Sequence, residues 1–273
     1  TYQPKQNLET IYQSLKSHHP DRSGAWRLEM PRHEQAMMMA RYYKSKEKEH
    51  QHFAPLIDWI NPYSAEIVRS QFWGDFIMTW IYDLHFQLLL DNTGAIIMGI
   101  IGLMLLVSLL IGLYLWWPKS GKFKSALTFK TNTSTERFVY DLHKVNGVYS
   151  FIILLIILLS GAILELPDYV NPVINHWSPL FKAPDLHSFH EEGKSRIPLD
   201  QVALIAAKHF PDAELRWLET PADANGTYWL RPYQKGEPSE RFPKTLLWID
   251  QYSGDILFER DPLLEKIGDT FLN

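Results

Sequence analysis

The chain has 273 residues, carries a formal net charge of −4 at pH 7 and contains no cysteine. The absence of cysteine excludes disulfides, thiolate chemistry and iron–sulfur ligation. No basic stripe mixed with aromatic residues occurs outside one short connection, so nucleic acid is not an expected partner. Two long uncharged runs, at residues 92–118 and 145–164, indicate a membrane protein.

The N-terminal segment, residues 1–75, predicts one helix followed by strands. Leu8, Ile11 and Leu15 have helical spacing, and Pro20 ends the helix. Later stretches are rich in tryptophan, tyrosine, isoleucine and leucine, and turn residues such as Asn61-Pro62 interrupt them. We therefore expect a small α+β domain in which the helix packs against a short antiparallel sheet.

Residues 76–94 are expected to form an interfacial helix and a turn before the first span. They contain the tetrapeptide Tyr-Asp-Leu-His, which ends at His85, and the turn is expected at residues 91–94. Residues 95–117 are almost wholly apolar and long enough to cross the hydrocarbon core as a helix. The glycines of this run are expected to serve close helix packing.

A second copy of the tetrapeptide ends at His143, just before the second uncharged run. We expect a loop at residues 118–139 and a second transmembrane helix at residues 140–166. Six lysines and arginines lie between Pro118 and Lys144, whereas the flanks on the opposite side of both spans carry none. This asymmetry predicts that the connection is cytoplasmic and that both larger segments lie outside.

The segment after the second span is expected to contain a connector, a second domain and the approach to a further span. These parts are residues 167–195, 196–262 and 263–273. The connector holds His187 and His190 at i,i+3 spacing. Exposure to solvent is the favoured interpretation of this pair over metal binding.

The second domain repeats the first. Residues 8–21 match residues 199–212 without a gap, and residues 59–68 match residues 248–257. The offset between the copies changes only from 191 to 189 residues across these blocks. Chance does not explain such collinear matches, so the sequence indicates an internal duplication.

The closing sequence WIDQYSGDIL of the second copy resembles the PepSY domain. The spans preceded by Leu-His, together with GLYLWWPKSGKFK at residues 112–124, resemble the PepSY-associated transmembrane family. This resemblance implies an α-helical transmembrane bundle of four spans, two of them visible here, with two periplasmic α+β PepSY-like domains. It also implies a multi-pass protein of the bacterial inner membrane, of which this chain is expected to be a truncated form.

Both tetrapeptide histidines are candidate axial ligands of haem iron. A histidine where a chain enters a bilayer is costly to place and usually serves a metal, a proton or a cofactor. A b-type haem in a helix bundle needs two imidazoles from different helices. His85 and His143 are expected at opposite membrane surfaces, so two haem b groups are expected, each with its second ligand outside this chain. The alternative for each histidine is an interfacial anchor or a helix cap.

Glycines near His143 fit a flat cofactor. Gly147 lies one helical turn after His143 on the same face, where a bulky side chain would press on a porphyrin. Gly161 follows His143 by 18 residues, or five helical turns, and is expected to face the same way near the opposite surface. Gly147 is therefore a candidate cofactor-binding residue beside the two histidines.

The resemblance implies an inner-membrane haem b reductase that carries electrons across the membrane. Its substrate would be ferric iron in the periplasm, held by a siderophore, and its other partners the lipid bilayer and an external electron donor. No phosphate-binding glycine loop follows a strand, so the donor is expected to be a quinol or a cytoplasmic reductase. Catalytic residues are not assigned. The alternatives are a non-enzymatic PepSY membrane protein that binds or regulates a periplasmic partner such as a protease, and a transporter built from parallel repeats.

Overall fold

The computed structural model describes residues 5–51, 53–118, 121–130, 132–177, 180–189 and 193–264. The chain divides into two compact units. The sheet unit comprises Thr1–Trp80 and Ile174–Asn273, and the helical unit comprises Ile81–Val173.

The first repeat of the sheet unit folds as one helix and four strands. α1 (Leu8–His18) begins after Asn7, whose side-chain oxygen accepts a hydrogen bond from the backbone N–H of Thr10 at 2.7 Å. Four strands follow and pair antiparallel in chain order: β1 (Trp26–Glu29), β2 (Met38–Tyr42), β3 (Leu56–Ile60) and β4 (Ile67–Phe72). A single 3-10 turn, Lys46–Lys48, lies between β2 and β3, and the expected turn at Asn61-Pro62 joins β3 to β4.

The second repeat has the same plan. α7 (Leu199–His209) is followed by the antiparallel strands β5 (Glu214–Glu219), β6 (Thr227–Tyr233), β7 (Leu246–Asp250) and β8 (Ile256–Arg260). Gly254, between β7 and β8, has φ +78°, a conformation in which a side chain would be strained. Each repeat therefore has the helix and the antiparallel strands expected from its sequence.

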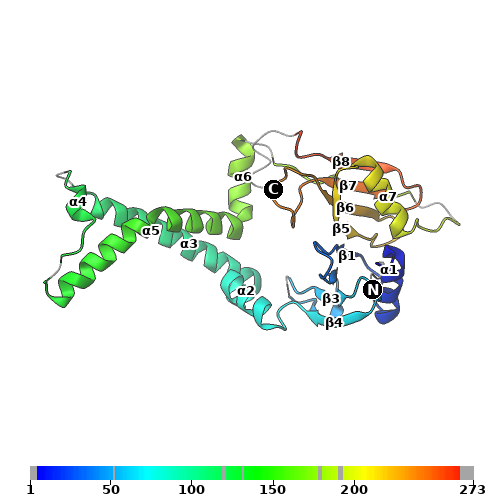
Figure 1. The fold of residues 1–273 in the computed structure, drawn as a ribbon, viewed down its shortest axis with the longest axis horizontal. Helices are drawn as coiled ribbons and strands as arrows, with labels where there is room; N and C mark the ends of the chain where they lie inside the picture. Colours follow the sequence, from blue (N-terminus) through cyan, green and yellow to red (C-terminus); the bar gives the residue numbers. More distant parts are fainter. Residues whose placement is uncertain are drawn as a thin grey trace. The chain divides into compact units, whose positions relative to one another are not determined.

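The two repeats share one sheet. Whereas the sequence predicts a short sheet in each repeat, the described strands form a single eight-stranded sheet in the order β4-β3-β2-β1-β5-β6-β7-β8 (Figure 1). β1 pairs antiparallel with β5, and Leu28 lies opposite Leu218, which holds the same position in the duplication. Each repeat thus offers the same edge to the other, as in a two-fold symmetric dimer.

Backbone hydrogen bonds at this join obey the same symmetry. The N–H of Thr220 donates to the carbonyl of Trp26 at 2.9 Å, and the N–H of Met30 donates to the carbonyl of Arg216 at 2.8 Å. In the duplication Trp26 corresponds to Arg216 and Met30 corresponds to Thr220. The joined edges therefore satisfy polar groups that an isolated repeat would expose.

The helices α1 and α7 also contact each other reciprocally. The carboxylate of Asp200 accepts hydrogen bonds from the N–H groups of Leu8 at 2.9 Å and Glu9 at 3.0 Å. In return, the carboxylate of Glu9 accepts a hydrogen bond from the N–H of Leu199 at 3.0 Å. Glu9 and Asp200 are equivalent positions of the two repeats. Each acidic side chain thus satisfies N–H groups at the N-terminus of the partner helix, where negative charge is favourable.

Both helices cover one face of the sheet and share a single core with it (Figure 1). α1 contributes Ile11 and Leu15, and α7 contributes Leu199 and Val202, all at most 1% exposed. The strands contribute fully buried side chains from both repeats, namely Trp26, Leu28, Leu218, Tyr228, Leu230, Leu247 and Ile249. The other face of the sheet presents the alternate residues of each strand.

The helical unit is built on two long helices. α3 (Asp91–Trp116) and α5 (Thr135–Glu165) are long and apolar enough to cross a membrane. Most of their large apolar side chains are exposed, including Met104 at 67% and Ile152 at 67%, which suits contact with lipid or with further helices. The remaining helices that involve this unit are short: α2 (Ile77–Gln87), α4 (Phe123–Ala126) and α6 (Pro167–Trp177).

Three boundaries differ from the sequence prediction. α5 begins at Thr135, five residues before the expected start, because Ser134 accepts a hydrogen bond from the N–H of Arg137 and caps a polar first turn. α6 occupies part of the expected connector at residues 167–195. The turn between α2 and α3 lies at residues 88–90 rather than 91–94, and Leu88 and Leu89 adopt φ of 51° and 58°.

Glycines near the start of α3 allow close packing, as expected. A Cβ at Gly94 would lie 1.7 Å from the carbonyl oxygen of Gln87, so the turn between α2 and α3 closes only around a glycine. A Cβ at Gly99 would lie 2.5 Å from the side chain of Leu166, at the C-terminal end of α5. Gly112, in contrast, has no atom within 4 Å of the same position.

We predict that Asp200→Ala destabilises the sheet unit. The change leaves two N–H groups of α1 without their acceptor, which we expect to lower the free energy of unfolding by about 1–3 kcal/mol. Urea unfolding of the detergent-solubilised chain, followed by tryptophan fluorescence, measures this loss. Asp212→Ala removes an exposed carboxylate of the same repeat and is the matched control. Equal unfolding midpoints for the two variants would contradict the reciprocal capping.

We further predict opposite effects of alanine at two glycines of α3. Gly94→Ala forces a methyl group against the Gln87 carbonyl and is expected to destabilise the helical unit by about 1–3 kcal/mol. Gly112→Ala meets open space and is expected to be neutral or to stabilise by up to about 1 kcal/mol through helix propensity. Thermal unfolding followed by circular dichroism compares the two, and the packing interpretation fails if both variants shift equally.

Candidate functional site

The two tetrapeptides place their side chains in the same way. His85 lies in the last turn of α2 and His143 in the N-terminal part of α5, and both histidines are exposed. The aspartates two residues earlier, Asp83 and Asp141, are buried. Residues two apart lie on opposite faces of a helix, so each buried aspartate leaves its histidine facing outward.

Asp141 fixes the start of α5. Its carboxylate accepts hydrogen bonds from Lys144 Nζ at 2.8 Å and from the backbone N–H of Lys130 at 3.2 Å, and it pairs with Arg137 at 3.3 Å. These partners come from the loop and from the helix itself. The hydrogen bond from the Lys130 N–H ties the Asp141 face of α5 to the loop, which restricts rotation of the helix and therefore the direction of His143.

The helix face beside His143 is open. Gly147 follows His143 by one turn, and no atom lies within 4 Å of a Cβ built on it. Gly161 has the same open surroundings. This contrasts with Gly94 and Gly99, whose Cβ positions are filled by neighbouring atoms. The described residues around His143 therefore fit a flat cofactor: an outward imidazole with an unobstructed surface next to it.

His85 and His143 lie near opposite ends of the α3–α5 pair. The contact between Gly99 and Leu166 places the start of α3 beside the end of α5. His85 precedes this end of α3 and lies near Glu165, at the C-terminus of α5. His143 lies 23 residues before Leu166, about 35 Å along a helix. One iron atom cannot bind both histidines.

Glu165 is an ionisable neighbour of His85. One carboxylate oxygen of Glu165, Oε2, is buried and has no hydrogen-bond partner among the described residues. No group of three metal-binding side chains comes together in the part of the chain that the structure describes. Neither tetrapeptide histidine therefore belongs to such a group within the described part of the chain.

Of the two connector histidines, the structure describes His187, which does not lie in a helix. The described residues 180–189 contain no helix, and His187 is exposed and pairs with Asp185 at 3.4 Å. His190 lies outside the described residues. The i,i+3 spacing therefore does not place His187 on the face of a helix.

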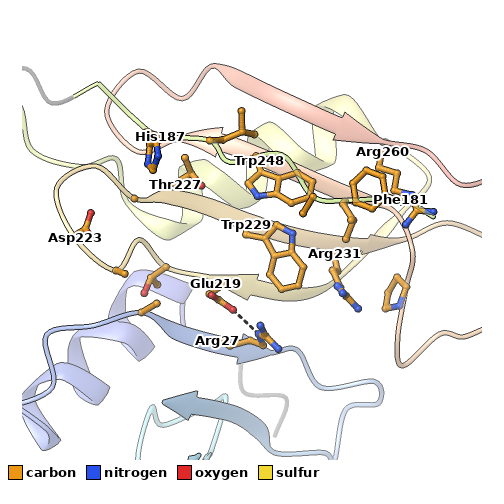
Figure 2. Close-up of a pocket in the computed structure, with 18 of the residues that line it drawn as sticks. Arg27, Phe181, His187, Glu219, Asp223, Thr227, Trp229, Arg231, Trp248 and Arg260 are labelled. Carbon is orange, nitrogen blue, oxygen red and sulfur yellow. Dashed lines mark hydrogen bonds and ion pairs between the residues drawn. The ribbon is translucent and has the colours of Figure 1, made fainter. Parts of the chain in front are cut away.

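A second candidate site lies on the sheet unit, on the face opposite α1 and α7. It is a cavity of about 660 Å³, lined by strands of both repeats and by residues of the segment 181–187 (Figure 2). Its floor follows one cross-strand row, in which Arg27 of β1 faces Glu219, Glu219 faces Trp229, and Trp229 faces Trp248. Typical ligand pockets occupy roughly 300–1,000 Å³, so this cavity can hold a small molecule.

The cavity has two chemically distinct ends. Figure 2 shows Arg27, Arg231 and Arg260 toward one end and Asp223 with His187 toward the other. Trp229 and Trp248 lie between them with ring centroids 6.2 Å apart. At the wall, the guanidinium of Arg260 lies 4.2 Å from the ring centroid of Phe181.

This cavity has no counterpart among the sites predicted from the sequence. Its residues alternate with core residues along short strands, for example Trp229 and Arg231 on either side of Leu230. Alternation predicts a half-buried strand but does not distinguish a solvated face from a binding face. The available signal was the tryptophan content of these outward positions, because tryptophan is highly buried on average.

Comparison with known proteins agrees with the fold. No curated protein matches the chain. Residues 3–269 match the protein family described as PepSY-associated TM region. This match covers both repeats and both long apolar helices, and it agrees with a membrane protein that carries a β-rich part. The chain therefore belongs to the PepSY-associated TM region family.

Proposed function

We propose that this protein is a haem b reductase of the bacterial inner membrane that carries electrons across the bilayer. Its substrate is ferric iron in the periplasm, held by a siderophore, and its product is ferrous iron for uptake. In this proposal both repeats lie in the periplasm and the lysine-rich connection lies in the cytoplasm. The protein has four spans, of which α3 and α5 are two.

One observation carries the proposal: two outward histidines near opposite ends of a membrane-length helix pair. His85 and His143 occur in the same tetrapeptide, and in each the buried aspartate directs the histidine away from the protein. An interfacial anchor would not require this repeated arrangement. Two ligand positions on opposite sides of an insulating layer are what transmembrane electron transfer requires.

The chain's own residues have defined roles in this proposal. His143 and His85 each provide one imidazole nitrogen, while Asp141 maintains the direction of His143 through Lys144 and the Lys130 backbone. Gly147 keeps the adjacent helix face clear. Haem b, when bound, supplies a one-electron redox couple.

The overall reaction balances with an external donor. One electron from a quinol or a cytoplasmic reductase converts one Fe(III) to Fe(II) outside. Hard oxygen ligands favour the smaller, more highly charged ion, so reduction weakens the chelate.

The rival function is a non-enzymatic membrane protein whose periplasmic repeats bind or regulate a partner such as a protease. A ligand cavity on the sheet is compatible with that function as well. The rival gives no role to the outward histidines or to the open face at Gly147. Haem binding therefore separates the two functions.

We predict that the full-length protein in membranes from haem-replete cells shows b-type absorption bands in a reduced-minus-oxidised spectrum. His143→Ala and His85→Ala are each expected to remove about half of the band amplitude, because each removes a ligand of a different haem. His50→Ala changes an exposed histidine of the sheet unit and is the control. A colourless parent protein, or bands unchanged in both variants, would refute the reductase.

We also predict that a large side chain at Gly147 removes the haem that depends on His143. Gly147→Leu fills the open face one turn from His143, whereas Gly112→Leu fills an equally open position on the other long helix, α3. The first variant is expected to lose roughly half of the absorption and the second to keep it, with equal helical content by circular dichroism. Equal haem content in the two variants would show that Gly147 has only a packing role.

A further inference from the structure

The cavity on the sheet unit is electrostatically unbalanced. Its lining contains four cationic side chains but only two carboxylates, Glu219 and Asp223. The cations are Arg27, Arg231, Lys244 and Arg260. Glu219 is already engaged by Arg27 at 2.7 Å. Asp223 lies toward the other end of the cavity and accepts a hydrogen bond from the backbone N–H of Asn225.

Two of the cations have no direct ion-pair partner among the described residues. Neither Arg231 nor Lys244 forms a side-chain hydrogen bond or an ion pair with any residue that the structure describes. Burial, together with the positive charges of Arg27 and Arg260, lowers the pKa of Arg231 to about 10. Burial and the charges of Arg231 and Arg260 also lower the pKa of Lys244. The carboxylates of Glu219 and Glu237 act against these shifts but do not pair directly with either cation. Proteins rarely maintain desolvated like charges without a directly bound partner of opposite sign.

Hydrogen-bond donors in the cavity are also unused. The indole Nε1 of Trp229 and the Nε of Arg231 are both buried, and neither has a partner among the described residues. A buried donor without an acceptor is energetically costly. Both residues line the cavity, so an acceptor placed there would satisfy them.

Aromatic rings provide the remaining walls. Trp229 and Trp248 lie side by side, and Trp248 contacts Phe258 edge to face at 5.6 Å. The guanidinium of Arg231 lies 4.7 Å from the ring centroid of Trp229. Such surfaces bind flat aromatic groups by stacking, while the adjacent cations bind oxygen anions.

We propose that this cavity binds a negatively charged aromatic chelate and that its ligand class is an iron(III) catecholate. The choice of a catecholate complex over other aromatic anions rests on the proposed reductase function. Iron(III) tris-catecholate complexes carry a net negative charge and present aromatic rings with oxygen acceptors. Arg231, Lys244 and the Trp229 indole N–H would receive those oxygens, and Trp229 and Trp248 would contact the rings.

The binding test uses gallium(III) tris-catecholate, which has the charge and shape of the iron complex but is not reduced. Isothermal titration with the full-length protein in lipid nanodiscs is expected to give a micromolar dissociation constant. Gallium(III) tris-acetohydroxamate, which is neutral and lacks aromatic rings, is expected to bind at least tenfold more weakly. Comparable affinity for the two complexes, or no binding of the catecholate complex, would overturn the proposal.

Substitutions locate the binding. Arg231→Gln and Lys244→Gln are each expected to weaken catecholate binding about tenfold or more, the effect of losing a hydrogen bond to a charged group. Each variant should be at least as thermostable as the parent, because it relieves repulsion within the cavity. Arg69→Gln is the matched control, since Arg69 is an exposed arginine stacked on Trp59 and does not line the cavity. Parent-like affinity in both cavity variants would contradict the assignment.

The duplication supplies an aromatic control. Trp248 lines the cavity and Trp59 is its equivalent in the first repeat, where it contacts Phe76 instead. Trp248→Leu is expected to weaken catecholate binding about tenfold, and Trp59→Leu is expected to leave it unchanged. Equal effects of these variants would exclude stacking on Trp248.

Binding of the gallium complex is expected to be independent of haem. His85→Ala and His143→Ala are expected to bind the gallium complex as the parent does. If the haem bands are present but the gallium complex does not bind, the cavity proposal fails and the reductase proposal stands. If the gallium complex binds to a protein that shows no haem bands, the reductase proposal fails and the cavity proposal stands.

Discussion

The pairing of β1 with β5 is the interaction on which the sheet unit depends. A four-stranded sheet has two edges whose N–H and C=O groups seek partners, and a duplicated chain carries the same edge twice. Here the two edges pair with each other, and Leu28 lies opposite Leu218 at the centre of the pairing. Glu9 and Asp200 form equivalent reciprocal hydrogen bonds between the helices. One continuous core results, although the two halves lie about 190 residues apart in the sequence.

This join also creates the cavity. Arg27 comes from the first repeat, whereas Trp229 and Arg231 come from the second, and the cross-strand row through Glu219 brings them together. The same residue has different surroundings in the two repeats: Trp248 lines the cavity, while Trp59 packs against Phe76. The duplication therefore supplies the architecture, and differences between the repeats shape this binding face.

The sequence predicts local structure better than it predicts this assembly. Helical spacing and proline identify α1 and α7, turn residues identify the β3–β4 and β7–β8 connections, and two apolar runs identify α3 and α5. These features depend on neighbouring residues. The pairing of β1 with β5 joins two strands that are far apart in the sequence, and no local sequence pattern predicts it. The cavity depends on the register between strands, which is determined only when the sheet has formed.

The histidine sites likewise combine features that the sequence predicts with features that only the folded structure shows. The repeated tetrapeptide identifies His85 and His143, and helical periodicity relates His143 to Gly147. The sequence does not reveal that Asp141 is fully buried and bonded to Lys144, or that Gly94 and Gly147 differ in their surroundings. Gly94 allows another part of the chain to approach closely, whereas Gly147 has open space beside it. The role of each glycine depends on its neighbours in the folded protein.

A designed disulfide tests the join of the repeats most directly. The chain has no cysteine, and Arg27 and Glu219 face each other in a pair without backbone hydrogen bonds between them, the closer type of antiparallel pair. The account predicts that Arg27→Cys with Glu219→Cys crosslinks within one chain on mild oxidation, seen by mass spectrometry of its peptides. Arg27→Cys with Trp217→Cys, displaced by two residues, should crosslink poorly. Equal crosslinking of the two pairs, or none in either, would show that the repeats do not share one sheet.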